Sequence, residues 1–337
     1  MSDRFNLLAS SAPSLSLTAE MLCLRAVLFA CALPLCSPRP LGLLPDEPLN
    51  DRPIIGILTQ EVTDPEMKPY GGAYIPSSYV KYIESGGARV IPIRLNQTRE
   101  EHERIFKSIN GLLLIGGASN LETSEFAHTT EIYFRLAVKA NDVGDYFPIW
   151  GTCMGFQLLT VLVAEQNLLS EIAAENVSLP LNLTSEASSS RMFEGFPPEL
   201  LKALSEEALT GNFHHYGVTE QVFRGNEKLT SFFSILSINT AKNGAVFVST
   251  MEGRKYPFYG VQWHPEVNRF QWSPQYSFPH SKNAVRLASL LAEFFVNEGR
   301  KSFHHFSQVE EESRALIYHY NPLYVANFTA YEQAYFF

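Results

Sequence analysis

Runs of aliphatic and β-branched residues alternate with helical runs from Asp51 onward, and this alternation restricts the fold more than any other feature of the sequence. Strands that alternate with helices form βαβ units, so the pattern predicts a mostly parallel sheet with helices on its faces. In the first half of the pattern we expect strands at residues 53–59, 88–94 and 111–115, and helices at residues 75–85, 98–110 and 129–143.

Local signals place two of these helix ends. Thr98 with Glu101 three residues later is a capping box, which predicts a helix start at that point. Gly86 and Gly87 are expected to end the helix before it.

The second half of the pattern is less regular. Between residues 166 and 220 we expect surface loops with one helix near residues 198–205. Further strands are expected at residues 146–150, 234–239, 245–251 and 258–263. A helix at residues 282–300 is expected to dock on the sheet through Val285, Ala288, Leu291 and Phe295. Since no linker or repeat follows residue 52, we predict one domain over residues 52–337.

Residues 21–40 (MLCLRAVLFACALPLCSPRP) have the layout of a secretory signal peptide. Their apolar stretch is too short to span a membrane and is followed by Pro-rich sequence. We expect cleavage between Cys36 and Leu44, and residues 1–20 form an upstream extension without an assigned role. The alternative is a buried N-terminal helix.

Cysteine usage follows from this leader. Removing it leaves Cys153 alone, because the other cysteines are Cys23, Cys31 and Cys36. The mature monomer then has no internal disulfide. Cys153 is either a reactive thiol or an inert buried cysteine.

Glycosylation sequons are consistent with a secretory route. Four Asn-x-Ser/Thr sequences occur without an intervening proline, at Asn96, Asn176, Asn182 and Asn327. The formal net charge of the chain is −9. Such an acidic chain offers no general attraction to phosphate backbones, so nucleic acid is not an expected partner.

Cys153 lies in the segment WGTCMG, between a predicted strand and an apolar helix. This is the cysteine counterpart of the strand-to-helix turn that presents a nucleophile, and its sharpness requires small residues such as Gly151 and Gly155. A helix N-terminus stabilises negative charge, so the position favours the thiolate.

A partner for this thiol is His264, in the segment VQWHPE at the end of a predicted strand. A histidine there can accept the thiol proton and later donate one to a departing amine. Glu266 can orient the imidazole and stabilise its cation. The alternative for His264 is a structural histidine at a strand end.

The motifs G-x-C-x-G and H-P-E, in this order, resemble the class I glutamine amidotransferase superfamily. The stretches PIIGILTQE, LLLIGGAS, IWGTCMGFQLL, SRMFEGFP and STMEGRKYPFYGVQWHPE are similar to the γ-glutamyl hydrolase family. The resemblance covers nearly all of the chain after Arg52. It implies a three-layer α/β/α sandwich and a lysosomal and secreted homodimeric peptidase without a cofactor. The implied substrates are folate and antifolate poly-γ-glutamates.

The same resemblance assigns roles to single residues. It implies Cys153 as nucleophile, His264 as acid/base and Glu266 as the third member of the triad. The backbone N–H groups of Gly117 and Met154 match the oxyanion hole.

Three substrate-binding candidates are less specific. Tyr74 and His214 resemble pocket residues, but Tyr74 could be a core aromatic and His214 a surface histidine. Arg191 is a candidate for binding the carboxylates of the substrate, or a solvated loop arginine.

Two other functions are compatible with these motifs. One is a glutaminase-type amidotransferase, and the other is an inactive secreted glycoprotein of the same fold. We read His304 and His305 as surface residues, and no His/Cys/Asp spacing predicts a metal site.

Overall fold

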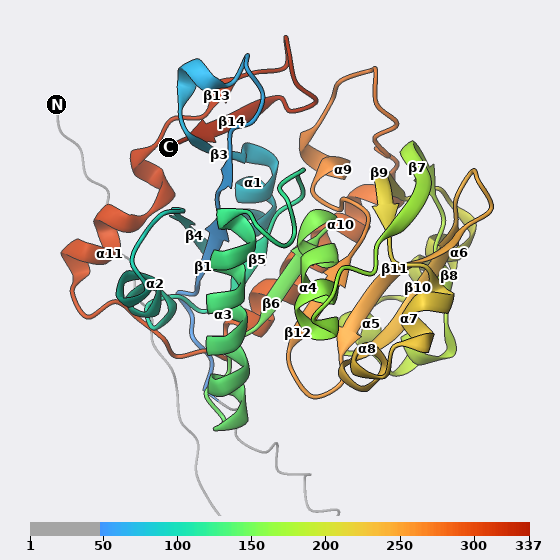
Figure 1. The fold of residues 1–337 in the computed structure, drawn as a ribbon, viewed down its shortest axis with the longest axis horizontal. Helices are drawn as coiled ribbons and strands as arrows, with labels where there is room; N and C mark the ends of the chain where they lie inside the picture. The colour runs from blue at the N-terminus through green and yellow to red at the C-terminus, as the bar shows by residue number, and fades with distance from the viewer. Residues whose placement is uncertain (1–47) are drawn as a thin grey trace, which may run out of the picture. The chain divides into compact units, whose positions relative to one another are not determined.

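The predicted alternation forms an eight-stranded central sheet in the computed structural model, which describes residues 48–337 (Figure 1). The strand order is β4-β1-β5-β6-β12-β11-β10-β8. The pairs from β4 to β12 are parallel, and the remaining three pairs are antiparallel. In chain order the strands are β1 (Ile54–Leu58), β4 (Arg89–Ile93), β5 (Leu112–Leu114), β6 (Ile149–Thr152), β8 (Asn182–Leu183), β10 (Phe233–Thr240), β11 (Val246–Gly253) and β12 (Phe258–Val261).

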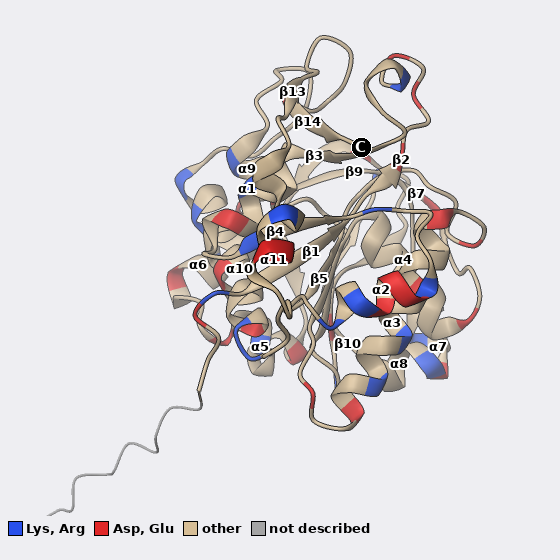
Figure 2. Cartoon of the chain, turned by 90° about the vertical axis from the view of Figure 1, so that its left-hand side faces the viewer, with Lys and Arg blue, Asp and Glu red and all other residues tan. Residues whose placement is uncertain are grey.

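Helices cover both faces of this sheet, and Figure 2 shows the sheet between them. One layer contains α1 (Ser77–Ser85) and α10 (Lys282–Gly299), which contact each other. The other contains α2 (Arg99–Phe106), α3 (Glu125–Asp142) and α4 (Met154–Ala164). The expected mostly parallel α/β/α sandwich is confirmed. Shorter helices complete the fold: α5 (Arg191–Glu194), α6 (Pro198–Glu206), α7 (Glu220–Gly225), α8 (Glu227–Phe232), α9 (Val267–Phe270) and α11 (Val309–Ala315).

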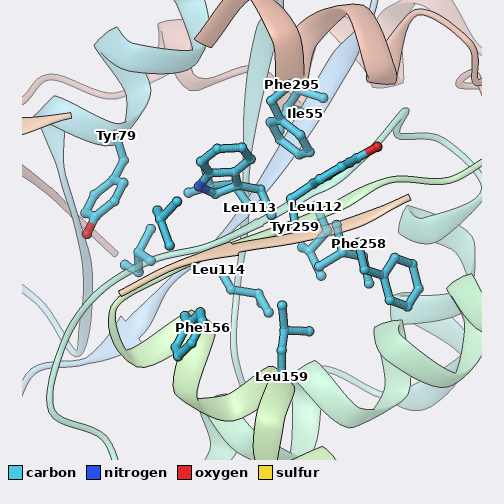
Figure 3. Packing of buried hydrophobic residues seen from close by; sticks show 14 of the residues in the cluster. Ile55, Tyr79, Leu112, Leu113, Leu114, Phe156, Leu159, Phe258, Tyr259 and Phe295 are labelled. Atoms are coloured by element: carbon cyan, nitrogen blue, oxygen red, sulfur yellow. The ribbon is translucent and has the colours of Figure 1, made fainter. Parts of the chain in front are cut away.

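The hydrophobic core lies on both faces of the central strands. All three residues of β5 are fully buried. Figure 3 shows Phe295 of α10 on one side of the sheet and Phe156 and Leu159 of α4 on the other. A strand buried on both faces reads as a continuous apolar run, which is why the GLLLI segment was recognisable.

Side-chain caps start several helices where the sequence indicated. The Thr98 hydroxyl accepts a hydrogen bond from the Glu101 N–H at the start of α2. Helix α10 begins after Ser281, which caps it in the same way. Its buried face contains Ala288, Leu291 and Phe295, but Val285 is exposed, so that part of the prediction is wrong.

The prediction of loops between residues 166 and 220 is also wrong. This region contains β7 (Ser170–Leu179) and β9 (Thr210–Gly217), which form a separate antiparallel pair. Most of β7 is half-buried, so it lacks the apolar run or strict alternation that identifies a strand. The helix expected near residues 198–205 is present as α6.

Two predicted boundaries differ from those in the structure. The first lies next to an additional sheet, which is smaller than the central one. This sheet has the order β13-β14-β3-β2. Its strands are β2 (Gln60–Glu61), β3 (Ala73–Pro76), β13 (Leu323–Tyr324) and β14 (Gln333–Phe336). Residues 75 and 76 therefore belong to β3, and α1 begins at Ser77. The strand expected from residue 146 begins at Ile149.

The described residues pack as one compact unit. The predictions of an upstream extension at residues 1–20 and of a signal peptide at residues 21–40 concern residues outside the described part of the chain. None of the described helices is long and apolar enough to cross a membrane.

Candidate active site

Cys153 occupies the sharp turn between β6 and α4. Its backbone has φ 51° and ψ −104°, a conformation that non-glycine residues rarely adopt. Hydrogen bonds hold it on both sides: its N–H donates to the Val261 carbonyl at 2.8 Å, and its carbonyl accepts from the Gln157 N–H at 3.0 Å. Such strain concentrates at functional sites, where the surrounding structure enforces it.

The glycines on either side of Cys153 are needed for close backbone approach. A Cβ at Gly151 would lie 2.6 Å from the Gly155 carbonyl carbon. A Cβ at Gly155 would overlap the backbone oxygen of Leu114 in the neighbouring strand. These close backbone contacts explain why small residues are required at both positions.

His264 and Glu266 follow the carboxyl end of β12, which pairs with β6 in parallel. The His264 N–H donates to the Gly211 carbonyl of β9 at 2.9 Å. Its Nδ1 lies 2.7 Å from Oε1 of Glu266. Both side chains are largely buried, with 13% of His264 and 3% of Glu266 exposed.

The charge of the His264 imidazole depends on its two neighbours. Burial alone would lower its pKa, but the Glu266 carboxylate and the Cys153 sulfur outweigh this and raise the pKa of His264 well above its ordinary value. Cys153 and His264 line the same cavity. Since Glu266 occupies Nδ1, Nε2 is the nitrogen left to exchange a proton with the sulfur.

The loop after β5 faces this pair. A Cβ at Gly116 would lie 2.7 Å from Cε1 of His264 and 3.4 Å from Cβ of Cys153. The Gly116 N–H donates to the Tyr79 hydroxyl at 2.8 Å, and that hydroxyl lies 3.3 Å from Nδ1 of His264. Tyr79 of α1 thus joins the glycine loop to the imidazole.

The two expected oxyanion-hole residues lie beside Cys153. Gly117 lines both cavities that open onto the sulfur, and Met154 lines the larger one. Met154 is the first residue of α4, and the N–H of a first helical residue has no partner inside its helix. A Cβ at Gly117 would overlap the side chain of Gln60, so glycine is required there.

Two cavities meet at Cys153, with volumes of about 280 Å³ and about 880 Å³. The sulfur is therefore accessible, although only 6% of the residue is exposed. The smaller cavity has an aromatic wall formed by Tyr74, Phe213, Tyr276, Phe278 and Tyr331. The larger cavity lies beside the first turn of α4 and the β9 segment 213–216.

Tyr74 lines the smaller cavity, so it is both buried and part of the site. It forms a hydrogen bond with Tyr331, and the two ring centroids are 6.2 Å apart. Burial raises the pKa of Tyr74 to about 12, so its hydroxyl remains protonated at neutral pH. Strand β14 pairs with β3, and Phe336 of β14 lies opposite Tyr74 of β3. This pairing brings Tyr331, which precedes β14, close to Tyr74.

His214 lines the larger cavity and is not a surface histidine. Its ring nitrogens contact the Tyr216 carbonyl at 3.0 Å and Oδ1 of Asn212 at 3.2 Å. Burial lowers the pKa of His214 to about 3, so the ring is neutral at physiological pH.

Arg191, the candidate for binding the carboxylates of the substrate, does not line either cavity. Its side chain forms an ion pair with Glu252 at 3.2 Å and a hydrogen bond to the Gly253 carbonyl. Its guanidinium lies 5.3 Å from the ring centroid of Tyr259, at the amino end of β12. His264 follows the other end of that strand.

Several residues of the site were not singled out from the sequence. Phe213 packs edge-on against the His264 ring at a centroid distance of 5.7 Å. The others are Tyr79, Tyr276, Phe278 and Tyr331. Their place in the site depends on contacts between distant parts of the chain.

Other polar candidates lie elsewhere. His304 is largely buried against Phe106 and Asp145, so the surface assignment is wrong for it, whereas His305 is exposed. Within residues 48–337, no three His, Cys, Asp or Glu side chains are grouped as metal ligands. The sequon residues Asn96, Asn182 and Asn327 are exposed.

Asn176 differs from the other sequon residues because it is half-buried. Its side chain donates to the Gln275 carbonyl at 3.0 Å and accepts from the Ser277 N–H at 2.6 Å. It therefore ties β7 to the loop that carries Tyr276.

Comparison with known proteins places this site in a family. Residues 53–266 match the family described as Peptidase C26. The chain belongs to the peptidase C26 family. It is 48% identical to human gamma-glutamyl hydrolase over 85% of this chain and 90% of the human protein. Against gamma-glutamyl hydrolase B of Dictyostelium discoideum, identity is 40%, with 86% of this chain and 84% of that protein covered.

Comparison with solved structures gives a weaker likeness. A glutamine amidotransferase from Thermotoga maritima superposes with a TM-score of 0.41 and 13% identity, covering 74% of this chain and 99% of that one. The family match ends at Glu266. Part of the smaller cavity, including Tyr276, Phe278 and Tyr331, therefore comes from the chain beyond the C26 match.

Proposed function

We propose that this C26 family member hydrolyses γ-glutamyl bonds in folate and antifolate poly-γ-glutamates through an acyl-enzyme on Cys153. The observation that carries the proposal is the arrangement of the strained Cys153 turn, His264 and Glu266 where two cavities meet. The relatives of similar length that bear the name gamma-glutamyl hydrolase supply the bond type.

The first half of the reaction forms a thioester. The Cys153 sulfur attacks the γ-amide carbon while Nε2 of His264 holds the thiol proton. The carbonyl oxygen becomes an oxyanion, which the N–H groups of Gly117 and Met154 stabilise. The C–N bond then breaks, and His264 gives its proton to the departing glutamate nitrogen.

The second half returns the enzyme to its starting state. His264, now neutral, accepts a proton from water, and the resulting hydroxide attacks the thioester carbon. The C–S bond breaks, and the proton returns to the sulfur. The γ-carboxylate is released. Glu266 holds Nδ1 throughout and stabilises the imidazolium that forms in each half.

Tyrosine hydroxyls and neutral donors are suited to bind the carboxylates of the substrate. We assign Tyr74 this role in the smaller cavity and His214 a supporting role in the larger one. The aromatic wall of the smaller cavity lowers the polarity around the reacting atoms, which strengthens the electrostatic interactions there.

The cellular setting is part of the same proposal. The signal-peptide pattern at residues 21–40 and the exposed sequon residues Asn96, Asn182 and Asn327 support entry into the secretory pathway. We propose that the protein is a glycoprotein that reaches the lysosome and the extracellular space and acts there as a homodimer.

The decisive experiment incubates the secreted protein with pteroyl-penta-γ-glutamate and identifies the products by mass spectrometry. We expect shortened pteroyl-γ-glutamates together with glutamate or oligoglutamate. The Cys153→Ala variant should lose at least about 10³-fold in turnover and keep its unfolding midpoint. Ammonia release from free glutamine without cleavage of the γ-linked substrate would instead indicate a glutaminase. Near-parental turnover by the variant would refute the nucleophile.

A further inference from the structure

The cleft presents an unusual charge pattern for a site that receives an anionic tail. Among the residues described, no Lys or Arg lines either cavity at Cys153. Glu175 and Glu266 line the smaller cavity, and Glu175 also lines the larger one. Glu266 is committed to His264 at 2.7 Å, which leaves Glu175 as the carboxylate that a substrate would meet.

Glu175 is directed into the cleft by the local structure of β7. Its neighbour Ala174 is fully buried and pairs with His214, so Glu175 faces the opposite way. The next residue, Asn176, has φ 51°, and the pairing register with β9 is irregular between Ala174 and Val177. This irregularity places Glu175 where the two cavities join.

One titratable side chain faces Glu175 directly. Nε2 of His215 in β9 lies 3.3 Å from Oε2 of Glu175, and their side chains are 70% and 41% exposed. Lys242 reaches the backbone carbonyl of Glu175 at 3.2 Å. His214 is held neutral by burial, and His264 is balanced by Glu266.

We propose that Glu175 is a specificity-determining residue that selects against long anionic tails. The inference rests on the proposed function, since it concerns how a poly-γ-glutamate binds to the same cleft. Each additional tail carboxylate near the junction is repelled by the Glu175 carboxylate, and no Lys or Arg among the described lining residues offsets that repulsion.

The size of the effect follows from Coulomb's law. Unit charges a few ångströms apart in a solvent-exposed cleft change affinity by about threefold each, and salt at about 0.15 M reduces this beyond roughly 8 Å. Several tail carboxylates can approach the junction. We therefore expect about threefold to tenfold between a long and a short tail.

The test measures binding in the Cys153→Ala background, so it does not depend on turnover. Dissociation constants for pteroyl-di-γ-glutamate and pteroyl-penta-γ-glutamate are compared with and without Glu175→Gln at pH 7.5 and low salt. We expect the substitution to tighten penta-γ-glutamate binding about threefold to tenfold and di-γ-glutamate binding less. The difference should shrink at high salt, because salt screens charges in an exposed cleft.

A control variant tests whether the position of the carboxylate matters. Glu171→Gln removes an exposed carboxylate from the same strand without touching either cavity, and should leave both constants unchanged.

A Glu175→Gln effect that equals that of Glu171→Gln, or that ignores tail length, would overturn the inference, as would undetectable binding of both ligands. If the parent chain binds but hydrolyses neither ligand, the proposed function fails, while the binding comparison still decides the role of Glu175.

Discussion

The two ends of the central sheet each hold a cluster of charged groups and tyrosines. We call the end whose charged groups line the two cavities at Cys153 the open end, and the other, whose charged groups line neither of them, the closed end. At the carboxyl ends of β6 and β12, Cys153, His264 and Glu266 face two cavities. At the amino end of β12, Glu298 accepts hydrogen bonds from the hydroxyls of Tyr146 and Tyr259, and Lys301 pairs with the same carboxylate.

The buried polar groups of the closed end also have a more complete set of hydrogen-bond partners. Arg191 pairs with Glu252, whose two oxygens also accept the N–H groups of Arg191 and Met192. At the open end, Oε2 of Glu266 is buried with no hydrogen-bond partner among the described residues. The backbone at Cys153 is strained as well, whereas no residue of the closed cluster has a positive φ.

The difference shows what separates a reactive cluster from a stabilising one. Buried charge occurs at both ends, so burial and charge alone do not identify a site. Strain, an incompletely satisfied carboxylate and access to a cavity occur together only at the Cys153 end. Substitutions at the open end should therefore affect rate, and those at the closed end should affect stability.

The largest expected effect concerns Glu266. Replacing it with Gln keeps the size of the side chain but removes the charge that stabilises the His264 imidazolium. We expect kcat to fall about 10³- to 10⁴-fold, as for the third member of comparable triads. Steady-state kinetics on pteroyl-penta-γ-glutamate would measure this. A kcat within tenfold of the parent would contradict the role of Glu266.

The same substitution carries a pH signature. The folded state raises the pKa of His264 above 6.5, so its contribution to stability is present below pH 6.5 and is lost as pH rises through the folded-state value. In Glu266→Gln this loss at high pH should be weaker. Urea unfolding across the pH range would show it, and an unchanged profile would contradict the coupling.

At the closed end, Arg191→Met should reduce stability and leave KM unchanged. The substitution leaves the largely buried Glu252 without its cation, which costs about 2–3 kcal/mol in the free energy of unfolding. Arg135→Met is the matched control, because its Glu131 partner is exposed and such pairs contribute less than about 1 kcal/mol. Equal losses in the two variants, or a raised KM for Arg191→Met, would erase the distinction between the two ends.

A last comparison concerns His214, which lies near the open end but is neutral. The pKa of His214 is about 3 in the folded state, below the ordinary 6.5. Between these two pH values the unfolded chain binds a proton at His214 and the folded chain does not. Stability therefore falls as pH decreases from 6.5 towards 3. His214→Gln should flatten this acid limb, whereas the exposed His305→Gln should not. Unfolding midpoints at pH 4 and pH 6.5 measure it, and parallel limbs would disprove it.

The sequence predicted the parts of the molecule whose signals are local. The Cys153 turn depends on neighbouring glycines, and the Thr98 cap on a residue three positions away, so both were visible in short segments. His264 and Glu266 lie at a strand end next to each other. Parallel pairing of β6 with β12 then brings them to Cys153.

The sequence could not predict features that depend on distant contacts. Arg191 lies near the amino end of β12, away from the two cavities, and residue type does not reveal which end of a sheet a side chain will reach. Strands β7 and β9 pair only with each other, and most of β7 is half-buried, so the periodicity of β7 is weak. The aromatic wall was missed because Tyr331 reaches the cavity only through the pairing of β14 with β3.

That pairing also sets the order in which the site can be completed during synthesis. A ribosome makes the chain from its amino end, so the nucleophile turn emerges long before Tyr331. Until β14 adds to β3, one wall of the smaller cavity is missing and Tyr74 lacks its hydrogen-bond partner. The nascent polypeptide therefore carries its thiol through translation without a finished binding cleft.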